Sequence, residues 1–378
     1  MRAVRSLVAP LLAVLAAAVV LLHAAGPVGA TTQLSARGTA GWVALEQAPA
    51  KAKSKSKVKR HLKAKPAGKK AKRPAKPRKR TVKRPVRATL PRPVTEPSLV
   101  PNDPLWRDSW SLTKVNAVGA WSVTTGAAET VVAVLDTGAD PSHPDLQGAF
   151  VPGYDTVNED SDPSDDHGHG TMVAGVVAAR ANNGIGVAGA CWRCSVMPVK
   201  VIGANGFGSA SDIAEGILWA TAHGARVINM SFTLSAPDAA VGAAVEHARS
   251  QGVLLVAAAG NTGTADVSYP AAYPGVVGVA GTTSADARYD WSTYGSWVRL
   301  AAPGCNMTTS PGAGYGDFCG TSSAAAFVSG LAGLARSVAG HLPPDAIAQA
   351  LSTNAAPVDF VSAGRVDAAG VLSSLKTP

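Results

Sequence analysis

The chain has 378 residues, 46% of them hydrophobic, and a formal net charge of +10, so it is long enough to bury a sizeable core. Residues 51–87 contain 19 of the 35 Lys and Arg residues, whereas residues 100–378 contain 12 basic and 23 acidic side chains, a formal charge of −11. The positive charge therefore belongs to one segment. It is no evidence for a basic globular domain with specific nucleic-acid recognition.

The first 30 residues are typical of a secretory signal peptide. Arg2 and Arg5 give a positive start, residues 7–25 are almost entirely apolar, and residues 28–30 form a small-residue cleavage site. An uncleaved membrane anchor is the alternative, because the apolar stretch is long for a signal. No later segment is long and apolar enough to cross a bilayer, so we expect a secreted, extracellular protein.

Residues 31–99 are expected to be a low-complexity Lys/Arg/Pro-rich pro-segment or linker. The tract at 51–98 has almost no large apolar side chains, and its prolines interrupt every helical stretch. Such a segment cannot bury enough surface to offset its ordering entropy, so we expect it to be disordered. Its positive charge at 51–87 could contact an anionic polymer such as DNA, cell-wall polymer or acidic lipid.

From residue 100 onward, runs rich in Val, Ile and Leu alternate with amphipathic segments. The predicted strands are 131–135, 196–202, 226–230, 253–257, 276–280 and 298–301. The predicted helices are 115–122, 170–181, 211–221, 238–250, 322–339 and 345–352. Uninterrupted apolar strands are typical of sheets buried on both faces. Residues 100–378 are therefore predicted to form a single α/β domain with a mostly parallel sheet flanked by helices.

Three short strings carry groups that can work together in catalysis. Asp136 lies in VAVLDTGAD, His169 in HGHGTMVAG and Ser322 in FCGTSSAAAF. Serine becomes a nucleophile when an imidazole takes its proton and a carboxylate orients that imidazole. Taken singly, these residues could be a strand-end turn, a helix start and an N-cap. Together, and in this order, they predict a catalytic triad.

With these motifs, residues 100–378 resemble the subtilisin-like serine proteases (subtilases), and in the N-terminal calcium motif they resemble thermitase-like members. The resemblance implies a subtilisin-like peptidase domain, active as a serine endopeptidase on protein or peptide substrates, and we expect a monomer. It also implies that Asn261, in LLVAAAGN, donates its side-chain amide to the oxyanion, with the Ser322 backbone N–H as partner. The alternative is a secreted polybasic binding protein with an idle protease-like domain.

The resemblance also implies where a substrate binds. An extended peptide would pair with two segments of the chain, and a pocket would receive the residue before the scissile bond. The implied substrate-binding residues are Gly206, Phe207, Gly208, Ser231, Phe232, Thr233, Ala258, Ala259, Gly260 and Ser268. Thr233 stands where the family usually has glycine, which would narrow the pocket entrance. Ser268 would give the pocket an uncharged floor, although Asp266 is close in sequence.

Calcium is the cofactor that the resemblance implies, in a structural role. The implied ligands are side-chain oxygens of Asp103, Asp145 and Asn183 and carbonyl oxygens of Ala181, Ile185 and Val187. Hard oxygen donors from separate segments suit the six to eight ligands of Ca²⁺. A plain turn at Asn182–Val187 is the alternative.

The chain also departs from the family pattern. The usual GTSMAAPHVAG reads GTSSAAAFVSG here, so Ala326 replaces a proline and the local helix geometry is in question. Moreover, the basic tract cannot be the folded propeptide usual in secreted members.

The chain has four cysteines, and an even number is typical of an exported protein whose cysteines all form disulfides. The CWRC spacing alone could be a zinc half-site or a redox pair. An oxidising compartment favours disulfides, and of three possible pairings we expect Cys191–Cys194 and Cys305–Cys319.

Overall fold

The structure, a computed structural model, describes residues 42–45 and 99–376. The expected signal peptide at 1–30 and the basic tract at 51–87 lie outside the described residues, so both stay predictions. Among the described residues, no helix is long and apolar enough to span a membrane.

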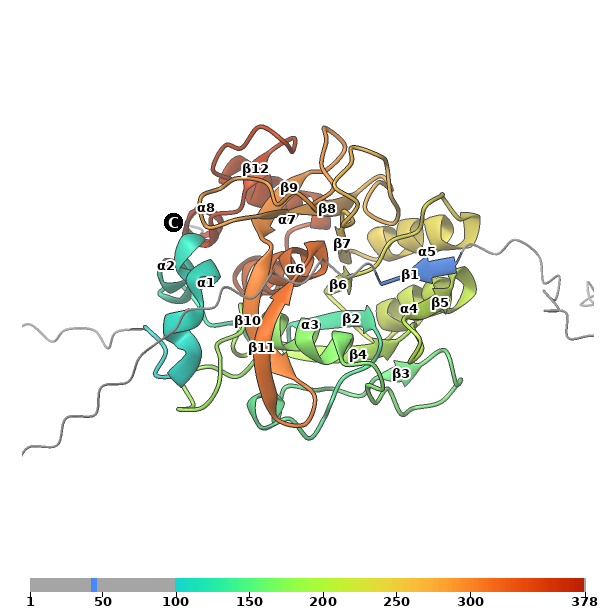
Figure 1. The fold of residues 1–378 in the computed structure, drawn as a ribbon, viewed down its shortest axis with the longest axis horizontal. Coiled ribbons are helices and arrows are strands. Elements are labelled where there is room, and N and C mark those ends of the chain that lie inside the picture. Colours follow the sequence, from blue (N-terminus) through green and yellow to red (C-terminus); the bar gives the residue numbers. More distant parts are fainter. Residues whose placement is uncertain (1–41, 46–98, 377–378) are drawn as a thin grey trace, which may run out of the picture. The chain divides into compact units, whose positions relative to one another are not determined.

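A parallel sheet forms the centre of the domain (Figure 1), and within the described ranges it has eight strands in the order β12-β9-β8-β7-β6-β2-β4-β3. The strands are β2 (Val131–Asp136), β3 (Tyr154–Asp155), β4 (Ser195–Lys200), β6 (Val227–Met230), β7 (Leu254–Ala258), β8 (Val276–Thr282), β9 (Leu300–Pro303) and β12 (Gly364–Arg365). β4, β6, β7, β8 and β9 are buried at every residue, as their continuous apolar sequences require. The predicted α/β fold is confirmed.

Helices cover both faces of the sheet. One face packs against α1 (Trp110–Lys114), α2 (Ala117–Trp121), α3 (His169–Ala178), α6 (Thr321–Ala339), α7 (Pro344–Thr353) and α8 (Ala368–Leu375). The other face packs against α4 (Ala210–Ala222) and α5 (Ala239–Ser250). Along β2, Val132 and Val134 join the first hydrophobic cluster while Ala133 and Leu135 join the second. This alternation puts the strand between two layers of helices.

Several elements were missed by the sequence patterns. These are the antiparallel hairpin of β10 (Cys305–Ser310) and β11 (Gly314–Cys319), the pair of β1 (Trp42–Ala44) with β5 (Phe207–Ser209), α1, α8, β3, β12 and the 3-10 helices η1 (Pro104–Asp108) and η2 (Pro144–Leu146). The hairpin sequence is polar and rich in glycine, so it lacks the continuous apolar run used to predict strands. Its side chains contact α3 instead, because Thr308 and Thr309 donate to the Met172 and Thr171 carbonyls.

Both expected disulfides are present. Cys305 and Cys319 occupy directly paired positions on β10 and β11, so their bond closes the base of the hairpin. Cys191–Cys194 closes a turn just before β4. Within the described part of the chain no cysteine is free, so these sulfurs are not zinc ligands.

Helix α6 crosses the sheet at close range. It is continuous from Thr321 to Ala339, so Ala326 in place of the family's proline leaves a regular helix. Close approach to α3 depends on Gly330, where an added Cβ would lie 2.7 Å from the Val177 carbonyl oxygen and 2.7 Å from Ala190 Cβ. The carbonyl is backbone and cannot move aside as a flexible side chain would.

Replacing Gly330 with alanine should therefore destabilise the protein, although alanine is the better helix former by about 1 kcal/mol. We expect a net loss of about 1–3 kcal/mol, from overpacking against α3. Thermal unfolding followed by circular dichroism measures it. Gly316→Ala is the control, because nothing lies within 4 Å of an added Cβ there. A melting temperature of Gly330→Ala at or above wild type would contradict the packing account.

Candidate active site

Asp136 and His169 form a close pair at the carboxyl end of β2. Asp136 is fully buried, and its Oδ1 lies 2.7 Å from His169 Nδ1 and accepts a hydrogen bond from the Thr137 N–H at 2.8 Å. A carboxylate accepts only, so His169 must carry a proton on Nδ1. Nε2 of the neutral ring is then the nitrogen that can take up a proton.

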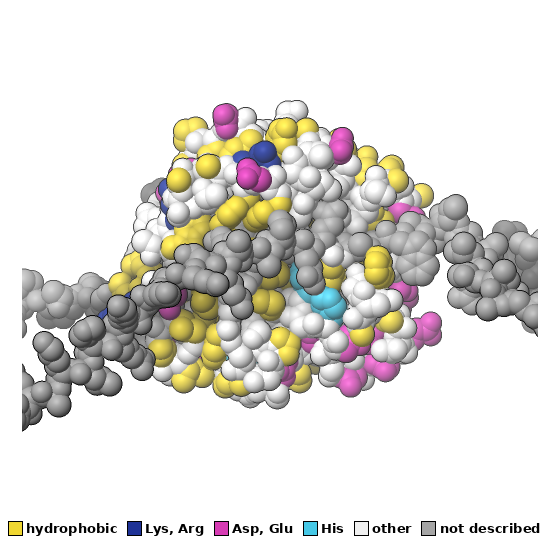
Figure 2. Space-filling model, viewed as in Figure 1, with side chains coloured by type: hydrophobic (Ala, Val, Ile, Leu, Met, Phe, Trp, Pro, Cys, Tyr) yellow, Lys and Arg dark blue, Asp and Glu magenta, His cyan; other side chains and the backbone are white. Residues whose placement is uncertain are grey.

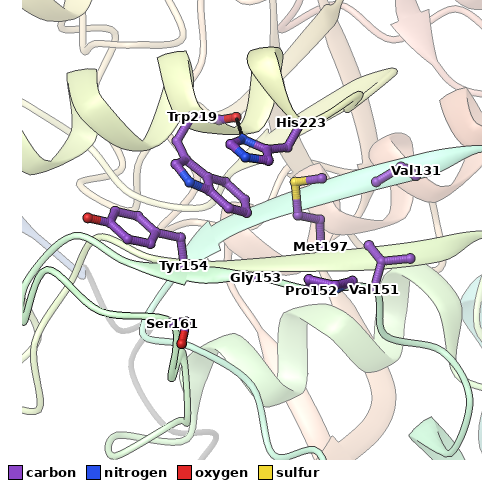
Figure 3. A pocket seen from close by; sticks show the side chains of 9 residues that line it. All are labelled: Val131, Val151, Pro152, Gly153, Tyr154, Ser161, Met197, Trp219 and His223. Carbon is purple, nitrogen blue, oxygen red and sulfur yellow. Dashed lines mark hydrogen bonds between the residues drawn. The ribbon is translucent and has the colours of Figure 1, made fainter.

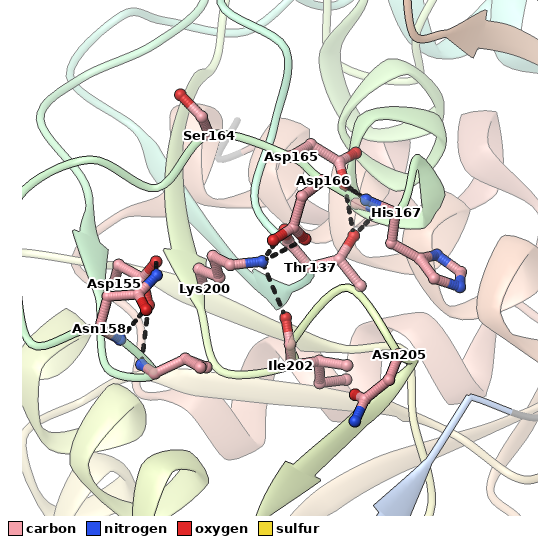
Figure 4. A network of polar contacts seen from close by, with 12 residues as sticks. Thr137, Asp155, Asn158, Ser164, Asp165, Asp166, His167, Lys200, Ile202 and Asn205 are labelled. Atoms are coloured by element: carbon pink, nitrogen blue, oxygen red, sulfur yellow. Dashed lines mark hydrogen bonds and ion pairs between the residues drawn. The ribbon is translucent and has the colours of Figure 1, made fainter.

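Asp165 fixes the start of helix α3, where His169 stands. Its Oδ1 accepts from Thr137 Oγ1 at 2.8 Å and from the Gly168 N–H at 2.7 Å, as part of the network in Figure 4. Its Oδ2 accepts from the Thr171 N–H at 2.9 Å. One carboxylate thus ties the loop after Asp136 to the first turn of α3, which keeps acid and base together.

Ser322 is the second residue of α6 and is 6% exposed. Its Oγ donates to the Ser231 carbonyl at 3.0 Å, and Ser231 Oγ donates back to the Ser322 carbonyl at 3.0 Å. Ser231 follows β6, whose Met230 pairs with Leu135 of β2, so Ser231 and Asp136 lie at neighbouring strand ends. While it donates to Ser231, the Ser322 hydroxyl cannot donate to another acceptor.

Asn261 and the start of α6 enclose a small polar space. Asn261 Oδ1 accepts from the Thr321 N–H at 2.9 Å, which turns the amide nitrogen away from that contact. A Cβ built on Gly320 would lie 3.4 Å from Asn261 Nδ2 and 3.7 Å from the Ser322 nitrogen. The Asn261 side-chain nitrogen and the Ser322 backbone nitrogen therefore lie on either side of the space that a side chain at Gly320 would fill. A helix N-terminus also favours negative charge there.

The edge strand β5 accepts an extended partner. Residues 42–44 pair with it in antiparallel register, and the Leu45 N–H donates to the Gly206 carbonyl at 3.1 Å. Phe207 is half exposed on this strand, while Gly208 is buried against the Val201 carbonyl. The expected first substrate segment therefore has the backbone geometry needed to bind a peptide.

The other expected substrate residues follow β6 and β7. Ser231 and Phe232 are buried and Thr233 is half-buried.

Next to β7, the Gly260 N–H donates to Thr321 Oγ1 at 3.0 Å, and Ser268 Oγ donates to the Ala259 carbonyl at 2.7 Å. Ala258 and Ala259 are buried. Ser268 thus lies against the strand end beside Asn261, and Asp266 is exposed.

Asp103 and Asp145 are buried carboxylates, 3% and 0% exposed. The Asn183 side-chain amide and the Val187 N–H donate to Asp145 at 2.8 Å each, and the Asn182 N–H donates to Asp103 at 2.7 Å. Burial raises the pKa of Asp145, and the nearby Asp103 charge adds to this. Among the ion pairs of the described residues, none joins either carboxylate to Lys or Arg.

This arrangement fits a calcium ion, because two uncompensated buried carboxylates call for a cation. Ala181 and the exposed Ile185 lie in the same loop as Asn183. In the described ranges no three His, Cys, Asp or Glu side chains gather, so a metal here would rely on amide and carbonyl oxygens. No sequence pattern indicated Tyr315, whose phenol pKa is raised to about 12 by burial and by the Asp145 charge.

A separate apolar cavity of about 540 Å³ lies between β3, β4 and α4 (Figure 3). Trp219 stacks between Tyr154 and His223, with ring centroids 5.3 Å and 3.8 Å apart. None of the catalytic candidates lines this cavity, so it is not part of the site.

Figure 2 shows Asp and Glu side chains gathered on one flank of the face that it displays, as the negative charge of residues 100–378 predicts.

Comparison with known proteins decides the family. The profile of the subtilase family of peptidases matches residues 127–372, well over half of the chain. The chain belongs to the subtilase family. The resemblance inferred from the sequence motifs is therefore confirmed.

Named relatives agree with this assignment. The chain is 42% identical over 216 residues, 57% of its length, to the thermophilic serine proteinase of Bacillus sp. (strain AK1). It is 39% identical over 236 residues, 62% of its length, to thermitase of Thermoactinomyces vulgaris, and these cover 84% of that protein. Among solved structures, a protease of Pseudoalteromonas arctica PAMC 21717 matches with a TM-score of 0.68 and 33% identity, over 73% of this chain and 100% of the other.

The match to the Bacillus proteinase spans only 54% of that protein's length. Family membership and the named proteinases support a serine endopeptidase, as the motifs predicted.

Asn261→Ala should lower kcat by about 10²–10³, a range established for this kind of donor in a subtilisin, with little change in KM. The donor acts on charge that develops only in the transition state. Peptide hydrolysis under steady-state conditions measures both constants. Thr321→Val is the control, because it removes the hydroxyl that contacts Asn261 Oδ1 and accepts from the Gly260 N–H, and it keeps the amide donor. Equal kcat losses in the two variants would show that Asn261 acts only through the cap of α6.

Proposed function

We propose that the chain is a secreted serine endopeptidase that hydrolyses peptide bonds through Asp136, His169 and Ser322. The observation that carries the proposal is the 2.7 Å contact between Asp136 and His169 at the strand ends where Ser322 also lies. The named proteinase relatives favour this over an idle domain with a polybasic binding function.

In the proposed reaction His169 Nε2 takes the proton of Ser322 Oγ while Oγ attacks the carbonyl carbon. The negative charge on the carbonyl oxygen is met by Asn261 Nδ2 and the Ser322 N–H. His169 then gives its proton to the leaving nitrogen, and the peptide bond breaks to leave an acyl-serine. Water attacks this ester by the same proton transfers and regenerates Ser322. Asp136 stabilises the imidazolium formed in both stages.

The substrate proposal follows from the edge strand and the pocket wall. A peptide would pair with Gly206–Gly208 and with Ser231–Thr233 through backbone hydrogen bonds, which tolerate many sequences. The pocket beside Ala258–Gly260 would end at Ser268, a neutral hydroxyl. We therefore expect uncharged residues before the scissile bond.

Calcium is proposed as a structural cofactor held by Asp103, Asp145 and Asn183 side chains and by Ala181, Ile185 and Val187 carbonyls. The support is the buried, uncompensated charge of Asp103 and Asp145. When bound, the ion would supply positive charge that stabilises the folded loop. It plays no part in the proton transfers above.

The N-terminal assignments complete the proposal. Residues 1–30 would direct export, residues 31–99 would be a pro-segment or linker, and residues 100–378 would be the peptidase domain, acting as a monomer. Contact of residues 51–87 with an anionic polymer is proposed from their charge alone.

Ser322→Ala should abolish peptide hydrolysis and leave the melting temperature nearly unchanged, because it removes one oxygen at a helix start. The losses from Ser322→Ala, His169→Ala and Asp136→Ala should not add in combined variants, since the three residues act as one unit. Rates per mole of purified, folded protein test this. Turnover by Ser322→Ala comparable to wild type would overturn the proposed function.

Removal of calcium should lower the melting temperature by about 5–10 °C if the free calcium concentration is initially about 100 times Kd. The reason is that a ligand of the folded state stabilises that state by mass action. Asp145→Asn should lower the melting temperature in the presence of calcium, and lower it much less in the presence of chelator. The folded-state pKa of Asp145 is raised, so without metal its ionised form opposes folding above its unfolded pKa, and asparagine removes that cost.

Scanning calorimetry of both proteins with calcium and with excess chelator measures this difference. Asp140→Asn is the control, because its carboxylate accepts from Ser142 and Gly312 and lies outside the proposed ligand set. Its effect should be the same in both solutions. Identical Asp145→Asn effects with and without calcium would remove the calcium assignment.

A further inference from the structure

Lys200, at the end of β4, is a buried cation with no role in the proposed reaction. It is 2% exposed, and its Nζ donates to the Thr137 carbonyl at 3.0 Å, to Asp166 Oδ1 at 2.6 Å and to the Ile202 carbonyl at 3.1 Å (Figure 4). An ammonium has three N–H donors, and all three are used. Burying a charge is costly unless it is fully paired, so this geometry is well defined.

The three acceptors come from three different loops. Thr137 directly follows Asp136 at the end of β2. Asp166 lies three residues before His169, in the turn that precedes α3. Ile202 begins the loop that leads to the edge strand β5. One ammonium therefore joins the loop of the acid, the loop of the base and the loop of the proposed substrate strand.

The backbone of Asp136 lies beside that of Lys200 in the sheet. Its backbone carbonyl accepts from the Val201 and Ile202 N–H groups at 2.9 and 3.2 Å, and Lys200 is its Cα partner on β4. In the described part of the chain, Asp136 Oδ2 is buried and has no hydrogen-bond partner. With no donor on Oδ2, the position of the Asp136 carboxylate depends strongly on its backbone, which pairs with β4 at Lys200 and continues into Thr137, an acceptor of the Lys200 ammonium.

We propose that Lys200 is a positioning residue of the catalytic centre, which holds Asp136 and His169 in register with each other and with the substrate strand. This inference rests on the proposed peptidase function. A purely structural Lys200 would contribute to stability but not to the rate of the folded enzyme. The two roles therefore differ in kcat at equal folded concentration.

The first test is Lys200→Met, which keeps the length of the side chain and removes the three donors. We expect kcat to fall about 10–100-fold, as small misplacements of catalytic groups do, with KM changed much less. Lys200→Arg should recover part of kcat. The matched control is Arg336→Met, which removes a buried cation that donates to the Leu342 and Gly252 carbonyls at the other end of α6 from Ser322. It should lower the melting temperature and leave kcat unchanged.

A second variant, Asp166→Asn, tests the proposal if Lys200→Met folds poorly. The Asp166 side chain is 49% exposed, so Asp166→Asn removes the charge of the pair without opening the core. Its kcat should fall several-fold, and its effect should not add to that of Lys200→Met. Unchanged kcat in folded Lys200→Met, or strictly additive losses, would overturn the proposal.

A second readout does not depend on turnover. The proton between His169 Nδ1 and Asp136 Oδ1 can be observed by proton NMR at low field, and its shift reports the geometry of the pair. Lys200→Met should shift or broaden this resonance, whereas Arg336→Met should not. An unchanged resonance would overturn the role of Lys200 even if no substrate is cleaved. Loss of turnover in Ser322→Ala tests the peptidase function separately.

Discussion

The hydrogen bond between the Asp136 carboxylate and the His169 imidazole is the contact around which the rest of the domain is arranged. It requires a buried carboxylate at the end of β2 and a helix that begins at His169 against that strand end. Parallel pairing of β2 with β6 places Ser231 alongside Asp136, and Ser231 in turn receives the Ser322 hydroxyl. Because parallel strands end at the same edge, three distant sequence segments meet without any special loop.

Much of this could be predicted from sequence, for a physical reason. Strands buried on both faces are uniformly apolar, so β2, β4, β6, β7, β8 and β9 were each anticipated to within two or three residues. The proposed catalytic residues stand in short strings next to those strands, where local sequence determines local structure. The disulfides were expected from the even number of cysteines in an exported chain, whereas the hairpin that Cys305 and Cys319 bracket was not predicted.

Other features depend on contacts that no local pattern encodes. β10 and β11 hold their place through hydroxyls that donate to carbonyls of α3, so their polar sequence resembles a loop. Lys200 ends an apolar strand, where a single lysine usually indicates a solvated terminus. Only the fold reveals that its ammonium is surrounded by three acceptors. Tyr315 likewise gains its contact with Asp145 through the hairpin, far from the loop motif that indicates calcium.

Asp136 and Asp145 are both fully buried carboxylates, and they differ in the hydrogen bonds that their oxygens accept. Asp145 has donors on both oxygens, Asn183 on Oδ1 and Val187 on Oδ2. Asp136 has donors on Oδ1 only, and within the described residues its Oδ2 has none. The imidazolium of the proposed reaction would bond to Oδ1, and only interactions that strengthen in the transition state raise the rate. Asp136 therefore has the His169 contact that the proposed mechanism requires, whereas the donors on Asp145 come from the loop proposed to hold calcium.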